Sequence, residues 1–264
     1  MENKTEFALH FEAKGSGTPL LLIHGFPLSG RMWAGQMEAL SSQAQVLAPD
    51  LPGFGDSPIS DTVYTVERYA EDCAAVLDAL DLLEPVAVGG LSMGGYIALA
   101  FARLFPERVG ALLLLSTRAG ADSAEGKAGR DKSIAGVKEH GASAVTEAMF
   151  PKLLAPANYS GQPAVATEAR ELMRTASPEG IIAALGAMRD RPDATGQLGN
   201  LDVPTLIVHG KDDQLIPSSE AEAMAAGIKG SQLHLIAQAG HLPNIEQPAE
   251  FNRIISQFLT QLMP

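Results

Sequence analysis

The feature that most constrains this chain is a serine flanked by glycines between a predicted strand and a predicted helix. Ser92 is the centre of a Gly-Leu-Ser-Met-Gly segment at residues 90–94. The apolar run 85–88 before it predicts a buried strand, and residues 96–104 after it predict a helix. A turn this sharp excludes side chains at the flanking positions and holds the serine in a strained conformation. We therefore predict a hydroxyl raised above the first turn of a helix, where backbone N–H groups can receive an anion.

The pentapeptide has a simpler explanation as well, because Ser92 could only cap the helix N-terminus. A second segment favours a catalytic role for Ser92 over a role as a helix cap. The run Leu-Leu-Leu-Ile at 20–23 leads into His-Gly-Phe-Pro at 24–27, which predicts a buried strand followed by a tight loop. Such a loop can supply an N–H donor to an oxyanion, beside the donor on the residue after the serine. We expect these donors to be the backbone N–H groups of Phe26 and Met93, although the loop could also merely end the strand.

Two later strands lead into loops that carry an acid and a base. The apolar segment 205–208 is followed by a glycine and then by Asp212 and Asp213. We assign the catalytic role to Asp213, which lies three residues after the glycine and four before a proline, and a loop-bracing role to Asp212. His241 follows the last apolar strand and precedes a terminal helix. Ligands of open α/β sheets bind at the carboxyl ends of the strands, so we expect the three side chains to meet there.

The chain order Ser92, Asp213, His241, together with the His-Gly-Phe-Pro loop and the histidine loop at 240–248, resembles the α/β-hydrolase family. The resemblance covers nearly the whole chain, and it is strongest to small bacterial esterases, enol-lactonases and cofactor-free haloperoxidase-like hydrolases. It implies a nucleophile, acid and base in that order. Family members that cleave haloalkanes or epoxides carry aspartate where this chain has Ser92, so those chemistries are not expected.

Strands that alternate with helices predict an α/β fold, with a mostly parallel sheet covered by helices on both faces. Between about 118 and 200 the apolar strand runs vanish, and stretches rich in Ala, Glu, Lys and Met predict helices. We predict an α/β-hydrolase core at residues 1–117 and 201–264, and a helical cap at 118–200. An edge strand is expected over 7–13 and a terminal helix over 248–262.

The composition of the chain limits the kinds of partner that it can bind. The chain has 264 residues, 46% of them hydrophobic, which suffices for one large core. Its net charge of −12 disfavours binding to nucleic acids and to anionic membranes, because phosphate contacts need clustered lysine and arginine. Cys73 is the only cysteine, so an intrachain disulfide is excluded. We find neither a signal core nor an apolar run long enough to span a bilayer, and we expect a cytoplasmic protein that is a monomer or a homodimer.

We expect neither a cofactor nor a metal, since the triad accounts for His241 without one. Candidate substrate-binding residues flank the proposed catalytic atoms or belong to the cap: Phe26, Met93, Leu215, Leu242, Phe150 and Met188. These side chains predict a largely apolar pocket for a neutral, small-to-medium acyl group. A diacid lactone would need a buried cation, and the sequence alone does not place Arg31, Arg118, Arg189 or Arg191 in the pocket.

We therefore favour a serine carboxylesterase that acts on a small-molecule ester through an acyl-enzyme. The alternatives are a lactonase acting on enol-lactones or acyl-homoserine lactones, a perhydrolase side activity, and a hydrolase of carbon–carbon bonds, all with the same triad. A slow ligand-binding receptor is an alternative of another class, because this fold also serves receptors.

Overall fold

A seven-stranded sheet organises the computed structural model, which describes residues 9–262. The strands are β1 (Phe11–Lys14), β2 (Thr18–Ile23), β3 (Ala44–Pro49), β4 (Val86–Leu91), β5 (Val109–Leu115), β6 (Thr205–Gly210) and β7 (Gln232–Ile236). Their spatial order is β1-β3-β2-β4-β5-β6-β7, and only the β1–β3 pair is antiparallel. The predicted α/β class with a mostly parallel sheet is confirmed. The edge strand expected over 7–13 begins outside the described residues, and β1 lies slightly later.

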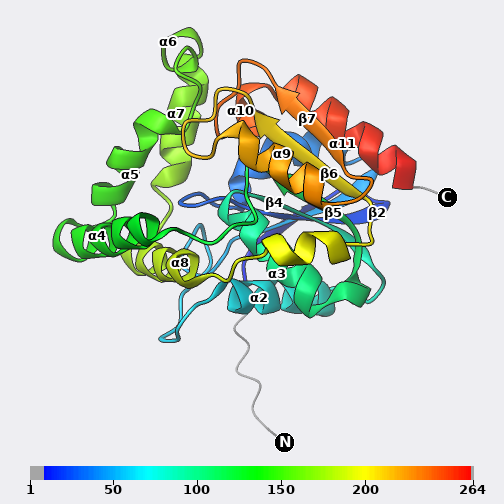
Figure 1. The fold of residues 1–264 in the computed structure, drawn as a ribbon, viewed down its shortest axis with the longest axis horizontal. Coiled ribbons are helices and arrows are strands. Elements are labelled where there is room, and N and C mark those ends of the chain that lie inside the picture. Colours follow the sequence, from blue (N-terminus) through cyan, green and yellow to red (C-terminus); the bar gives the residue numbers. More distant parts are fainter. Residues whose placement is uncertain (1–8, 263–264) are drawn as a thin grey trace, which may run out of the picture.

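The central strands read as continuous apolar runs because helices cover both faces of the sheet. Side chains alternate between the two faces along each strand. Leu21 and Ile23 of β2 therefore join one buried cluster with α2 (Val66–Ala79) and α3 (Met93–Leu104), whereas Leu20 and Leu22 join a second cluster with α1 (Ala34–Leu40) and α11 (Pro248–Leu262). Figure 1 shows α2 and α3 on one side of the sheet and α11 on the other.

The helices follow the strands in the expected alternation. They are α1 (Ala34–Leu40), α2 (Val66–Ala79), α3 (Met93–Leu104), α4 (Ala124–His140), α5 (Ser143–Met149), α6 (Asn158–Gly161), α7 (Pro163–Met173), α8 (Pro178–Asp190), α9 (Ser218–Gly227), α10 (Pro243–Glu246) and α11 (Pro248–Leu262). The terminal helix has the predicted bounds. None of the helices within the described range combines the length and the apolar character that crossing a membrane requires.

Helices α4 to α8 all lie between β5 and β6 in the chain, and we call residues 118–200 the helical insertion. Figure 1 shows these helices, coloured green to yellow, grouped at one side of the sheet. Hydrogen bonds tie the insertion to several loops of the sheet, for example those after β3 and β7. Ser177 donates through its backbone N–H and its hydroxyl to the carbonyl of Gly53, each at 2.9 Å. The backbone N–H of His241 donates to the carbonyl of Leu153 at 3.0 Å.

The turn between β4 and α3 leaves no space for a side chain at Gly90 or Gly94, two residues before and after Ser92. Ser92 itself has φ 56° and ψ −113°, a left-handed conformation that is rare for a residue with a side chain. A Cβ added to Gly90 would lie 2.0 Å from the carbonyl oxygen of Gly94. A Cβ added to Gly94 would lie 2.2 Å from the carbonyl oxygen of Ile23. The glycines are therefore required by the close approach of strand and helix.

This requirement predicts opposite effects of the same substitution at two helical glycines. Gly94→Ala should lower the free energy of unfolding by about 1–3 kcal/mol or more, because backbone atoms must move to admit the methyl group. Gly186→Ala should raise it by up to about 1 kcal/mol, because no other group lies within 4 Å of its added Cβ and alanine favours helix. Chemical denaturation of both variants checks this, and equal stabilities would contradict the packing described here.

Candidate active site

Ser92, at the turn between β4 and α3, lies in the wall of a cavity. Ser92 is 9% exposed, and it lines a cavity of about 310 Å³ together with His241. Its backbone is fixed from the neighbouring strand, because its N–H donates to the carbonyl of Leu115 at 2.9 Å and the Thr117 hydroxyl donates to its carbonyl at 2.7 Å. The Ser92 side chain makes no capping hydrogen bond to α3, so the helix-cap explanation does not account for it.

Asp213 and His241 form a buried pair at the same edge of the sheet. The Nδ1–H of His241 donates to Oδ2 of Asp213 at 2.7 Å, with side chains 1% and 0% exposed. The other oxygen, Oδ1, accepts the backbone N–H groups of Leu215 and Ile216 at 2.8 and 3.1 Å. The Nε2 atom of His241 is buried and has no hydrogen-bond partner among the described residues. Nδ1 of the imidazole is therefore anchored, and Nε2 remains without a hydrogen bond within the part of the chain that the structure describes.

Burial alone would raise the pKa of Asp213, but the charge of a protonated His241 and the hydrogen-bond donors outweigh it and hold that pKa well below its usual range. The carboxylate thus stays ionised and fixes the proton of His241 on Nδ1. The buried His209 adds to this environment, with Nε2 3.3 Å from Oδ2 of Asp213 and 2.9 Å from the carbonyl of Ile216. Asp212 is exposed and takes no part in the pair.

The two expected oxyanion donors belong to the residue after the serine and to a loop that packs against it. Met93 is the first residue of α3, and Phe26 lies in the loop after β2 and lines the cavity. Within the described residues, neither backbone N–H donates a hydrogen bond to a protein acceptor. A Cβ added to Gly25 would lie 3.6 Å from the Cβ of Ser92, so the loop before Phe26 packs directly against the serine.

His24 braces this loop. Its Nε2 accepts the backbone N–H of Leu51 at 3.0 Å, so the proton sits on Nδ1, which donates to the carbonyl of Gly25 at 2.9 Å. Burial lowers the pKa of His24 below its ordinary value, against the opposing effects of the Gly25 carbonyl and the Asp50 charge. The neutral imidazole therefore holds the loop before Phe26 against the loop after β3.

The candidate substrate-binding residues divide into two groups. Phe26, Leu215 and Met188 line the cavity. Met93, Leu242 and Phe150 do not: the first two side chains point into the buried clusters on the two sides of the sheet, and the Phe150 ring stacks beneath the guanidinium of Arg170, 3.9 Å from its centroid.

The cavity also contains residues that the sequence did not place there. Its remaining lining residues are Tyr96, Arg118, Arg130, Ser133, Ala144, Val145, Ala148, Met149, Lys152, Leu185 and Ile216. The expectation of a largely apolar pocket does not account for the three cations in this set. They come from the loop after β5 and from the helical insertion, and a linear sequence gives no indication that these segments converge.

Glu246 is a site residue to which sequence reasoning gave no role, although it stands in the histidine loop. Its Oε1 accepts the backbone N–H groups of Gly240 and Leu242 at 2.8 and 3.2 Å, on both sides of His241. Its Oε2 accepts from the Ala155 N–H and the Asn158 side chain of the insertion, each at 2.7 Å. Burial raises the pKa of Glu246 and these donors oppose the rise. Glu246 thereby joins the histidine loop to the helical insertion.

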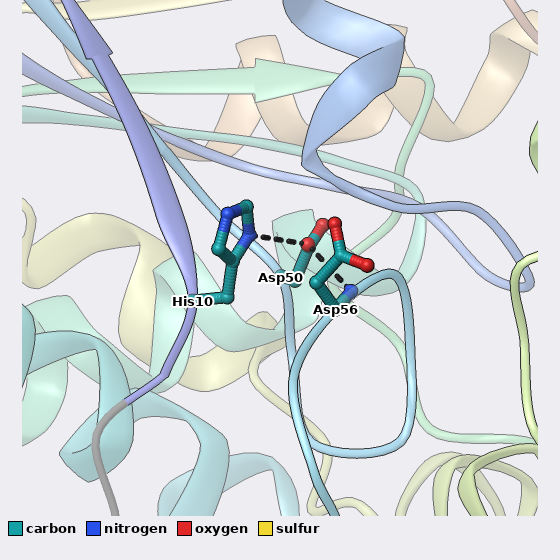
Figure 2. Close-up of side chains that lie close together, drawn as sticks. All are labelled: His10, Asp50 and Asp56. Carbon is teal, nitrogen blue, oxygen red and sulfur yellow. Dashed lines mark hydrogen bonds and ion pairs between the residues drawn. The ribbon is translucent and has the colours of Figure 1, made fainter.

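A second acidic cluster, His10, Asp50 and Asp56, has ligand atoms within 4.8 Å of one another (Figure 2). The oxygens of Asp50 are already engaged by nitrogen atoms. Oδ1 accepts the N–H of Gly30 at 2.7 Å, and Oδ2 accepts the N–H of Asp56 at 3.0 Å and lies 2.8 Å from Nδ1 of His10. Donors at every side of this carboxylate suit a loop brace rather than a cation site.

Comparison with known proteins gives a consistent set of matches. A family model described as the alpha/beta hydrolase fold matches residues 18–248. A thermophilic esterase from Thermogutta terrifontis is 41% identical, with a TM-score of 0.94, over 97% of this chain and 94% of that chain. The enol-lactonase of Burkholderia xenovorans LB400 is 26% identical, with a TM-score of 0.88, over 96% of each. The 2-hydroxymuconate semialdehyde hydrolase of Pseudomonas sp. strain CF600 is 30% identical over 94% of this chain and 88% of its own.

The lowered pKa of His24 predicts how folding stability depends on pH. A histidine with a lowered pKa in the folded protein contributes stability that is complete above the unfolded value of about 6.5 and is lost as the pH falls toward the folded value. Below about pH 6.5, the free energy of unfolding should therefore fall by up to about 1.4 kcal/mol per pH unit through His24. Denaturation at several pH values should show a shallower slope in His24→Gln, which keeps an acceptor but cannot be protonated. Parallel slopes would contradict the neutral, bridging role of His24.

Proposed function

The chain belongs to the α/β-hydrolase fold family, and on that premise we propose that it is a serine hydrolase that cleaves carboxylic esters of small molecules through an acyl-enzyme intermediate. One observation carries the proposal. The imidazole of His241 is anchored through Nδ1 to Asp213, and it lines the same cavity as the hydroxyl of Ser92. Nucleophile, base and orienting acid are thus gathered from three different strand ends, as acyl transfer requires.

In the first half of the proposed reaction, Nε2 of His241 takes the proton of the Ser92 hydroxyl while its oxygen bonds to the carbonyl carbon of the ester. Asp213 keeps the imidazole oriented and stabilises its positive charge. The carbonyl oxygen becomes an oxyanion between the free N–H groups of Phe26 and Met93. One such donor contributes on the order of a hundredfold to a thousandfold in turnover.

The intermediate then collapses, and the bond to the alcohol oxygen breaks as His241 returns its proton to the leaving group. The acyl group remains on Ser92 as an ester. Water enters, loses a proton to His241 and attacks this ester, which releases the carboxylic acid and regenerates the Ser92 hydroxyl. The helical insertion is proposed to act as a cap, because it supplies Val145, Met149 and Met188 to the cavity wall.

A lactonase is the second candidate, because ring opening of a lactone uses the same steps and leaves the alcohol tethered to the product. The family also includes the 2-hydroxymuconate semialdehyde hydrolase named above. We favour the ester reaction, since the esterase from Thermogutta terrifontis has a higher identity to this chain, 41%, than the enol-lactonase at 26% or the semialdehyde hydrolase at 30%.

Replacement of the nucleophile tests the proposed function. Ser92→Ala should lower hydrolysis of p-nitrophenyl butyrate by about a thousandfold or more, because no acyl-enzyme can form. Its folding should persist, as judged by circular dichroism and thermal unfolding. The matched control is Ser116→Ala, since Ser116 directly follows the neighbouring strand β5, is buried and also has a positive φ of 41°. Ser116→Ala should keep turnover within a fewfold of the parent, and undiminished turnover in Ser92→Ala would overturn the assignment.

A further inference from the structure

We propose that the cavity selects acyl groups that carry a second, anionic group, and that Arg118 and Arg130 bind this group as a carboxylate. The proposal rests on the proposed function, because it names the substrate class of the same site. It replaces the neutral acyl group that the sequence suggested. The substrates would be half-esters of dicarboxylic acids or lactones that bear a carboxylate.

Charge is distributed very unevenly in this chain. The net charge of the protein is −12, yet the cavity that contains Ser92 is lined by Arg118, Arg130 and Lys152. Among the described residues that line it, none is an aspartate or a glutamate. A cavity wall with one sign of charge attracts a ligand of the opposite sign. The imbalance therefore points to an anion as the natural occupant.

Arg118 lies close to the reacting centre. The hydroxyl of Thr117, the residue before Arg118, donates a hydrogen bond to the carbonyl of Ser92. Arg118 also borders Tyr96, which lies on α3 one turn after the serine and lines the same cavity. Arg130 approaches from α4 in the helical insertion. The two guanidinium groups thus reach the cavity from the loop after β5 and from α4.

A single buried carboxylate holds these guanidinium groups in place. Asp122, whose side chain is 2% exposed, pairs with Arg118, with Arg130 at 3.1 Å and with Arg191 at 2.9 Å. Burial opposes ionisation, but the arginines prevail and lower the pKa of Asp122. The single negative charge of Asp122 leaves two of the three arginine charges uncompensated. The carboxylate of Glu220 forms no ion pair with Arg118, but its charge offsets part of this positive excess.

The arginines retain donors for a ligand. A guanidinium group has five N–H donors, and Asp122 engages only some of them. The side chains of Arg118 and Arg130 are 27% and 24% exposed, so each keeps accessible surface beside its contact with Asp122. Arg191 takes a different role, because its guanidinium stacks on the ring of Tyr96 at 4.1 Å from the centroid and does not line the cavity. Planar guanidinium groups bind carboxylates through paired, charge-assisted hydrogen bonds, which are strong where water is scarce.

The rest of the wall suits a short hydrocarbon linker. Val145, Met149, Leu185, Met188 and Leu215 are apolar and line the same cavity. An acyl chain of a few methylene groups would contact these side chains between the ester carbon at Ser92 and a terminal carboxylate at the arginines. A neutral chain of the same length would leave the arginine donors without a partner in a partly dry site, at a cost in affinity.

Two esters of matched shape test the proposal. Monomethyl glutarate carries a terminal carboxylate, and methyl 5-methylhexanoate carries an isopropyl group of similar shape in its place. Hydrolysis is followed by proton release, with Ser92→Ala as the background. We expect kcat/KM to be about tenfold or more higher for the charged ester, because one charge-assisted hydrogen bond strengthens binding by about that factor. In the wild type, equal or lower kcat/KM for the charged ester overturns the proposal without reference to any variant.

Charge-removing variants assign the effect to residues. Arg118→Met and Arg130→Met should each lower kcat/KM for the charged ester about tenfold, mainly through KM, and should lower the ratio of kcat/KM between the charged and the neutral ester by a similar factor. The neutral ester also reports whether each variant is folded. The matched control is Arg189→Met, which removes one cation from α8 whose partners Asp131 and Asp190 lie outside the cavity lining. Equal effects of Arg118→Met and Arg189→Met on the charged ester would overturn the proposal.

Failure of the proposed function gives a different result. In that case neither ester would be hydrolysed above the rate of Ser92→Ala. Ser92-dependent hydrolysis of both esters without preference for the charged one would keep the hydrolase and remove the anion site. Added NaCl provides an independent readout, since preference for the charged ester should fall as salt screens the arginines. A preference that is insensitive to salt and to both arginine variants would also overturn the anion site.

Discussion

The rest of this structure depends on how closely strand β4 and helix α3 approach at Ser92. The space permits only hydrogen atoms on Gly90 and Gly94, and the chain passes through a left-handed conformation between them. That conformation costs free energy, which the packing of strand and helix must offset. It directs the Ser92 hydroxyl away from capping α3 and onto the cavity, with the first N–H of the helix beside it.

Buried carboxylates then position the loops that meet at this point. Asp213 fixes the imidazole of His241, Glu246 holds the backbone on both sides of that histidine, and Asp50 ties the loops after β2 and β3. Asp122 gathers three arginines beside the cavity. Each carboxylate accepts several donors, so each is satisfied despite its burial. Loops at the carboxyl edge of a parallel sheet lack the regular backbone hydrogen bonds of paired strands. These carboxylate contacts hold the loops in place instead.

Much of this arrangement could be predicted from local sequence. Apolar runs placed the central strands, the spacing of glycines placed the turn at Ser92, and the pattern after Pro248 gave the bounds of α11. These features depend on neighbours in the chain. The start of α1 is less local, since a 3-10 turn at Gly30–Trp33 precedes it and helix ends depend on tertiary contacts as well as on propensity.

The contents of the cavity could not be predicted in the same way. Sequence adjacency to a functional residue does not give the direction of a side chain, so Met93 and Leu242, which neighbour Ser92 and His241, point into the core. Arg118 and Arg130 line the cavity from separate elements, and both pair with Asp122 there. The role of Glu246 was equally hidden, since two of its donors lie about ninety residues earlier in the insertion.

The central claim is that Asp213 and His241 activate the Ser92 hydroxyl, and covalent labelling tests it most directly. A fluorophosphonate reagent leaves a stable adduct on an activated serine, which intact-mass measurement and peptide mapping locate. We expect one adduct, on Ser92, formed at similar rates in the wild type and Asp212→Asn and about a hundredfold or more slower in Asp213→Asn. A wild-type protein that remains unlabelled, an adduct on another residue, or equal rates in the two aspartate variants would contradict it.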